Sequence, residues 1–182
     1  MGLRVKFNLM LLVAFLFGLV LAGFLSNQML RKNAREEVEQ NARIMIESAL
    51  AVRGYTAKEI YPLIKDQLSE KFLPQTVSAY AAGQNMKALR DKFPDYIYKE
   101  AALNPTNPND RASDWEADII NAFRNDNALK ELIVPRDTPT GPVLNLARPL
   151  QIKTEGCLNC HNRPEQAPKT MIDAYGPANG FG

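Results

Sequence analysis

The chain has 182 residues, of which 46% are hydrophobic and 23% are charged, a balance typical of one globular domain with an appended helix. The formal net charge of +2 is too small for the basic surface of a nucleic-acid-binding protein, so we expect no nucleic-acid partner. Two cysteines are too few for the disulfide framework of a small secreted domain.

The N-terminal segment is apolar enough to cross a membrane. Residues 7–25 carry no charge, and Asn8 is their one polar side chain. A run of this length, at about 1.5 Å per helical residue, nearly spans a hydrocarbon layer about 30 Å thick. We therefore expect residues 1–26 to form an uncleaved single-pass anchor. The alternatives are a secretory signal cleaved after Ala22 and a helix buried in a protein core.

Residues 27–52 predict a helix that connects this anchor to the rest of the chain. The segment holds no proline or glycine, and its apolar side chains recur every three or four residues, as on one face of a helix. This face either packs on the chain's own domain or pairs two copies in a homodimer through residues 27–52. Its members are Ala34, Val38, Ala42, Met45, Ala49 and Val52.

The middle of the chain predicts two further helical stretches and a loop. Helical spacing resumes after Gly54 over residues 55–68, and residues 75–93 predict a helix that ends before Pro94. Residues 104–113 contain two Asn-Pro steps, which predict a loop.

A capping signal follows this loop. Ser113 precedes a helical pattern that begins near Trp115 and ends near Asn125, and Glu116 lies three residues beyond Ser113. A serine followed three residues later by glutamate is typical of a capping box, so we expect Ser113 or Asp114 to cap this helix.

The last third of the chain predicts a sheet. Residues 134–142 are rich in turn formers and predict a linker, whereas residues 143–152 alternate as in a strand. We expect a turn at Glu155 and Gly156 to follow. Together these elements predict an α+β fold, with long N-terminal helices and a small antiparallel sheet.

Residues 157–161 read Cys-Leu-Asn-Cys-His and hold both cysteines and the one histidine of the chain. Cys-x-x-Cys-His is the signature of covalent haem attachment. Two thiols three residues apart can bond to the vinyl groups along one edge of a porphyrin, and the adjacent histidine can supply an axial nitrogen. We therefore expect Cys157 and Cys160 to carry one haem c and His161 to bind its iron.

Three other interpretations of these residues compete with haem. A structural zinc site needs four ligands, and the window offers three. A thioredoxin-like dithiol is usually followed by a helix that lowers the pKa of the first thiol, and residues 162–168 do not predict a helix start. The third alternative is an inert pair of cysteines.

The haem interpretation also sets the orientation in the membrane. Haem is coupled to this motif outside the cytoplasm, so we expect an inner-membrane protein with its haem domain on the periplasmic side. Arg4 and Lys6 then remain in the cytoplasm, in accord with the positive-inside rule.

The opposite side of the iron has one leading candidate. Met45 lies on the apolar face of the predicted connecting helix, so it could reach into a haem pocket as the sixth ligand; ordinary core packing is its alternative role. Met86 and Met171 are further methionines, and an open site is also compatible with the sequence. Haem propionates need cationic or hydroxyl partners, and the candidates are Arg53, Tyr55 and Arg148. Each of these could equally be a solvated surface group or an ordinary ion-pair partner.

Five stretches of the chain carry a resemblance that covers about residues 49–182. They are VRGYT (52–56), FPDYIYKEAALNPTNPNDRASDWEADII (93–120), LARP (146–149), CLNCH (157–161) and YGPANGFG (175–182). On these stretches the sequence resembles the periplasmic PAS-like c-type haem domains of bacterial membrane sensor kinases and of stand-alone membrane-anchored cytochromes.

The resemblance implies a PAS-like haem domain over residues 53–182, in which helices flank a small antiparallel sheet. It also implies one haem carried by Cys157, Cys160 and His161, with Arg53 and Tyr55 near the haem pocket.

Two functions remain open from the sequence. The first is a membrane-anchored one-electron redox protein that exchanges electrons with a partner complex or a soluble carrier. The second is a haem-based sensor subunit of redox state or a small gas, which would signal through a separate membrane protein. A distal histidine and an acid/base pair are missing from the sequence, so we do not expect an enzyme.

Overall fold

The computed structural model describes residues 2–181. Two compact units make up the chain, one ending at Asn41 and the other beginning at Ala42. Helices and a two-stranded antiparallel sheet form the fold, so the predicted α+β class is confirmed.

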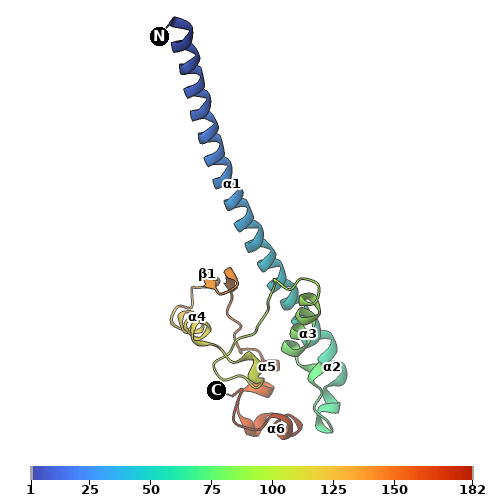
Figure 1. The fold of residues 1–182 in the computed structure, drawn as a ribbon. Helices are drawn as coiled ribbons and strands as arrows, with labels where there is room; N and C mark the ends of the chain where they lie inside the picture. Colours follow the sequence, from blue (N-terminus) through green and yellow to red (C-terminus); the bar gives the residue numbers. More distant parts are fainter. Residues whose placement is uncertain (1, 182) are drawn as a thin grey trace. The chain divides into compact units, whose positions relative to one another are not determined.

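The first helix, α1, runs from Leu3 to Tyr55 without a break (Figure 1). It includes the predicted anchor and the predicted connecting helix, and it continues through Gly54. A π-helical turn over Thr56–Ile60, helix α2 (Tyr61–Ile64) and a 3-10 turn over Lys65–Ser69 follow it. Pro62 lacks the backbone N–H that an α-helix would use, and the change of hydrogen-bond pattern falls directly before it.

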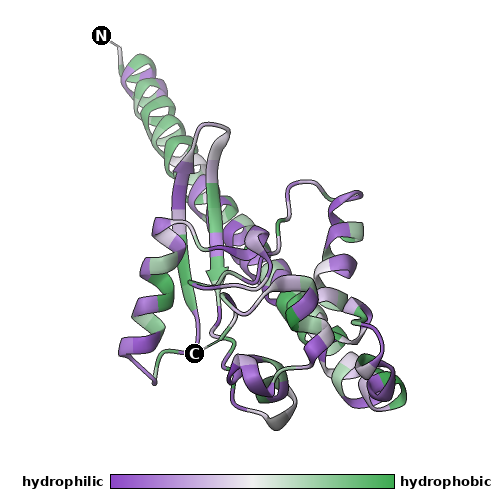
Figure 2. Ribbon diagram, turned by 90° about the horizontal axis from the view of Figure 1, so that it is seen from below, coloured by the Kyte–Doolittle hydropathy of each residue, from purple (hydrophilic) through white to green (hydrophobic). Residues whose placement is uncertain are grey.

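One helix of the described chain, α1 with its extension to Ser69, is long and apolar enough to cross a membrane. Its N-terminal part is predominantly hydrophobic in Figure 2. None of its most apolar stretch is buried against protein, which argues against the alternative of a core helix.

The core of the second unit forms between α1 and helix α3 (Ser78–Arg90). Ala49 of α1 and Ala82 of α3 are fully buried and belong to the same cluster. Met86 completes the cluster with 4% of its surface exposed. Four partly buried side chains pack against it: Met45, Val52, Leu89 and Tyr98.

Helix α4 (Asp114–Asn125) begins with the predicted capping box at Ser113. The carboxylate of Glu116 accepts hydrogen bonds from the backbone N–H and the hydroxyl of Ser113, both at 2.8 Å. Lys99 donates a third bond to the same oxygen at 2.7 Å. The preceding loop contains a short 3-10 turn, Pro108–Asp110.

The sheet pairs β1 (Leu132–Thr138) with β2 (Gly141–Ala147) in antiparallel register, from Leu132 opposite Ala147 to Thr138 opposite Gly141. The predicted linker over residues 134–142 is therefore wrong except at residues 139–140, because residues 134–138 belong to β1 and residues 141–142 belong to β2. Pro135 is compatible with this strand because both strands of a two-stranded sheet are edges, where a missing N–H can be tolerated. The predicted strand over 143–152 ends early, at Ala147.

Two short helices close the chain, α5 (Glu155–His161) and α6 (Lys169–Tyr175). The predicted turn at residues 155–156 is wrong, because these residues form the first turn of α5. Thr154 has an extended backbone and occupies the N-cap position. Gly176 ends α6 with a φ of +77°, a conformation that glycine adopts without steric cost.

Candidate functional site

Helix α5 brings the three residues of the Cys-x-x-Cys-His motif together. On an α-helix, residues three and four positions apart lie on the same face, so Cys160 and His161 both neighbour Cys157. Both cysteines are free thiols, and both are partly exposed. The hydroxyl of Thr154 lies 3.0 Å from Sγ of Cys157.

The imidazole of His161 is held in one orientation. Its Nδ1 lies 2.7 Å from the backbone carbonyl oxygen of Gly180. A carbonyl oxygen only accepts hydrogen bonds, so Nδ1 carries the proton and donates it. In the neutral ring, the lone pair is then on Nε2, which is the arrangement that a metal-ligating histidine needs.

A pocket of about 400 Å³ opens beside this histidine. Ile152 and Leu158 contribute apolar side chains to it, and 52% and 39% of their surfaces are exposed. Small-molecule sites usually combine apolar side chains with a few polar groups, and this pocket has both kinds. The lining residues are Ile152, Leu158, His161, Asn162 and Arg163.

The donor set fits a covalently bound haem. Two free thiols are available for the porphyrin edge, and Nε2 of His161 is available for the iron. Exposed apolar side chains beside them offer a surface that the flat face of a porphyrin could cover. The same three residues could therefore hold the group that the sequence motif implies.

The zinc alternative to haem receives little support from the geometry. Among residues 2–181, no group of three or more His, Cys, Asp or Glu side chains is arranged to hold a metal ion, and a zinc site would need one. Burial raises the pKa of the Cys160 thiol, and the neighbouring Cys157 raises it further. A reactive dithiol is distinguished by a lowered pKa of its first cysteine, so the raised pKa of Cys160 does not separate a dithiol from a haem site.

The predicted propionate partner Arg53 binds a carboxylate of the protein. Its guanidinium pairs with Glu100, and the hydroxyl of Tyr98 donates to the same carboxylate at 2.9 Å. Burial raises the pKa of Tyr98, and the charge of Glu100 raises it further. Tyr55 is 61% exposed. Arg53 is thus paired with Glu100, and Tyr55 lies on the surface. Neither residue lines the pocket beside His161.

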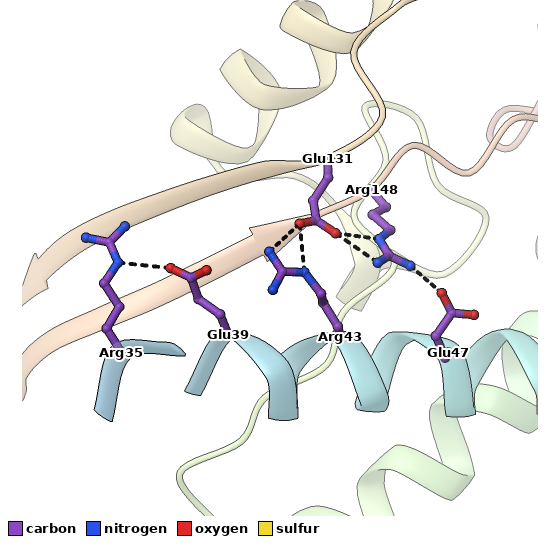
Figure 3. Close-up of polar contacts among 6 residues, drawn as sticks. All are labelled: Arg35, Glu39, Arg43, Glu47, Glu131 and Arg148. Carbon is purple, nitrogen blue, oxygen red and sulfur yellow. Dashed lines mark hydrogen bonds and ion pairs between the residues drawn. The ribbon is translucent and has the colours of Figure 1, made fainter. Parts of the chain in front are cut away.

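Arg148 belongs to an ion-pair network that joins α1 to the sheet (Figure 3). Glu131, directly before β1, accepts bonds from Arg43 at 2.9 Å and from Arg148 at 2.8 Å. Arg148 also reaches Glu47 at 2.5 Å. These guanidinium groups hold the pKa of Glu131 below its ordinary value, Arg43 most strongly. Arg148 therefore already has two carboxylate partners.

The methionine candidates lie in apolar packing. Met45 packs against the cluster of Ala49, Ala82 and Met86, and Met171 is buried in α6. None of these methionines is among the residues that line the pocket of His161. The structure does not bring Met45 and His161 together around one pocket. The role of Met45 as an iron ligand stays a prediction.

Sequence reasoning did not single out Gly180, the partner of the histidine. Gly180 contributes its backbone carbonyl oxygen, which every residue has, so the identity of the side chain does not point to this position. It does lie within the YGPANGFG stretch that carries part of the family resemblance.

Fold and site together define an α+β protein in which one short helix presents two free thiols and an oriented histidine. A family model described as Tll0287-like matches residues 31–182, so the chain belongs to the Tll0287-like family. This membership is compatible with a haem-binding periplasmic domain. No curated protein and no solved structure matches the chain.

Proposed function

We propose that this protein is a membrane-anchored periplasmic cytochrome of the c type, which carries one haem and transfers one electron at a time. One observation carries the proposal: His161 donates Nδ1–H to the carbonyl of Gly180, and this leaves Nε2 as a ligand beside two free thiols. The Tll0287-like family membership supports it.

Each residue of the motif has a separate task in this proposal. Cys157 and Cys160 would hold the haem covalently through their thiols. His161 would bind the iron through Nε2, and the carbonyl of Gly180 fixes the orientation of its ring. When bound, the haem supplies an iron that cycles between the ferric and ferrous states.

The proposed location follows from chemistry and from the apolar helix. Haem c is attached outside the cytoplasm, and α1 is long and apolar enough to anchor the chain in the inner membrane. A carrier tethered in this way exchanges electrons with a partner complex or a soluble carrier at the membrane surface, and it needs no acid/base groups of an enzyme.

The experiment that tests the proposal removes the two thiols. We expect the Cys157→Ala, Cys160→Ala double variant to lose haem that survives on a denaturing gel, whereas wild type retains it. Asn159→Ala is the matched control, because it changes an exposed side chain between the cysteines and leaves the motif intact. Haem stain that persists in the double variant would overturn the proposal.

A second candidate function is a haem-based sensor subunit. It is favoured by the continuity of α1, which runs from the apolar stretch to the core cluster and to the ion pair of Glu47 with Arg148. A change at the haem could then reach the membrane through one element and be read by a separate partner. Visible spectra of the ferrous protein, with and without carbon monoxide, separate electron transfer from the sensing of a small gas.

Ferrous protein that does not bind carbon monoxide would favour electron transfer over the sensing of a small gas. Ready uptake of carbon monoxide by the ferrous protein would favour the sensing of a small ligand.

A further inference from the structure

We propose that Gly180 is a positioning residue that sets the orientation and the electron donation of His161, and that the loop from Asn104 to Thr106 holds Gly180 in place. This inference rests on the proposed function, since it concerns the histidine that would bind the iron. It assigns a role to two stretches, NPTNPND and YGPANGFG, that the haem motif itself leaves unexplained.

Gly180 is bound on both sides of its backbone. Its carbonyl oxygen accepts the bond from Nδ1 of His161 at 2.7 Å, and its N–H donates to the carbonyl of Asn104 at 3.0 Å. Asn104 lies before α4 in the sequence and His161 lies in α5, so one residue connects the loop to the histidine. The position of the carbonyl that orients the imidazole therefore depends on the loop.

The local geometry requires glycine at this position. Gly180 has a φ of +88°, which other residues rarely adopt. A Cβ built on it would lie 2.0 Å from Oγ1 of Thr106 and 3.2 Å from its Cβ. That hydroxyl oxygen is buried and has no hydrogen-bond partner. Any side chain at residue 180 would thus push against Thr106 and move the carbonyl.

Hydrogen bonds within residues 102–112 hold the loop that contacts Gly180 in a defined conformation. Ala102 donates to Asp110 and accepts from Ala112, both at 2.9 Å, and these bonds close the base of the loop. Asn107 caps the 3-10 turn by accepting from the N–H of Asn109 at 3.2 Å. Pro105 is buried between them. A loop held at its base and turn gives Gly180 a fixed partner.

The bond from the histidine to Gly180 has a chemical consequence. A carbonyl that accepts Nδ1–H fixes the ring and makes Nε2 a stronger electron donor to a bound metal. Stronger donation favours the ferric over the ferrous state. Removing or lengthening this bond should therefore raise the midpoint potential and weaken the bond from iron to histidine.

The test compares Gly180→Ala with Gly176→Ala in the full-length holoprotein. Both glycines have positive φ, so both variants carry a similar backbone penalty, but a Cβ at Gly176 meets nothing within 4 Å. We expect Gly180→Ala to retain covalent haem on a denaturing gel and to show a positive shift of the midpoint potential. Gly176→Ala should match wild type in both.

A second variant keeps glycine in place, in case Gly180→Ala does not fold. Thr106→Leu enlarges the side chain that faces Gly180, so the potential should shift in the same direction, whereas Thr106→Ser keeps the hydroxyl and should leave it unchanged. A midpoint potential equal to wild type in both Gly180→Ala and Thr106→Leu would overturn the positioning role. Wild-type protein without covalent haem would instead overturn the proposed function itself.

Discussion

His161 is suited to bind a metal because its other ring nitrogen already has a partner. The carbonyl of Gly180 accepts the Nδ1 proton, which leaves Nε2 with its lone pair. Met45, the predicted sixth ligand, lies in an apolar environment. It packs against the cluster of Ala49, Ala82 and Met86, where a flexible thioether fills space as any apolar side chain would.

Replacing Met45 by leucine separates these two roles. Met45→Leu conserves volume and removes the sulfur, so as a core residue it should cost less than about 1.5 kcal/mol of unfolding free energy and leave the visible spectrum unchanged. The measurement is the ferrous spectrum with and without carbon monoxide, together with the midpoint potential. Met86→Leu, in the same cluster, is the control. A spectrum that changes in Met45→Leu alone would identify Met45 as the sixth ligand.

Among the elements, α1 and the sheet are joined by alternating charges. Glu131 forms ion pairs with Arg43 and Arg148, and Arg148 forms a second ion pair with Glu47 (Figure 3). The neighbouring α4 depends on a different carboxylate. Burial raises the pKa of Glu116, but bonds from Lys99 and Ser113 outweigh it and hold that pKa below its ordinary value.

The ion-pair network predicts a loss of stability in acid. The pKa of Glu131 is lowered in the folded state, first by Arg43 and then by Arg148, from an ordinary value of 4.5. A lowered pKa stabilises the fold above the pKa of the unfolded chain, and this contribution disappears as the pH falls through the folded-state pKa. We expect the network to lose roughly 1 kcal/mol between about pH 5 and pH 3.

Thermal unfolding in detergent over this pH range measures the effect. Glu131→Gln should be less stable than wild type near neutral pH and should show a shallower pH dependence. Glu70→Gln, at an exposed carboxylate, is the control. Equal pH dependence in wild type and Glu131→Gln would show that this network does not contribute.

The N-terminus of α4 gives a second prediction for an element. Ser113→Ala removes the hydroxyl that donates to Glu116 and should lower the unfolding free energy by about 1 kcal/mol. Ser113→Thr keeps a hydroxyl and should lose less than half of that. Chemical denaturation of the holoprotein in detergent compares the three proteins. An unchanged denaturation midpoint in Ser113→Ala would contradict the prediction.

For the molecule as a whole, the apolar part of α1 is long enough to cross a membrane. Its side chains are exposed, and a mostly apolar surface of this length is stable in a hydrocarbon layer rather than in water. Uncleaved, this helix is an anchor; cleaved after Ala22, it would be a secretory signal.

Intact mass spectrometry of protein isolated from membranes distinguishes the two. We expect residues 1–22 to be present and the protein to stay in the membrane fraction after an alkaline carbonate wash. Replacing Leu12 and Leu16 by lysine should release it or prevent its insertion, because each charge in a hydrocarbon layer costs about 3 kcal/mol. A mature chain that begins at Gly23 would show cleavage.

The sequence by itself determined the features that depend on local chemistry. An uninterrupted helical pattern predicted α1 across residues 27–52, and Ser113 with Glu116 predicted the cap of α4. The spacing of Cys157, Cys160 and His161 predicted a set of ligands within one turn of chain. These features depend on neighbours in sequence, so composition and spacing are enough to indicate them.

Only the tertiary structure decided the features that depend on distant partners. Pro135 lies in a strand because β1 has one open edge, which no local pattern shows. Arg148 is occupied by Glu131 and Glu47, whose positions follow from packing. The orientation of His161 comes from a backbone carbonyl at Gly180, and every residue has such a carbonyl, so only the path of the chain selects the one that binds.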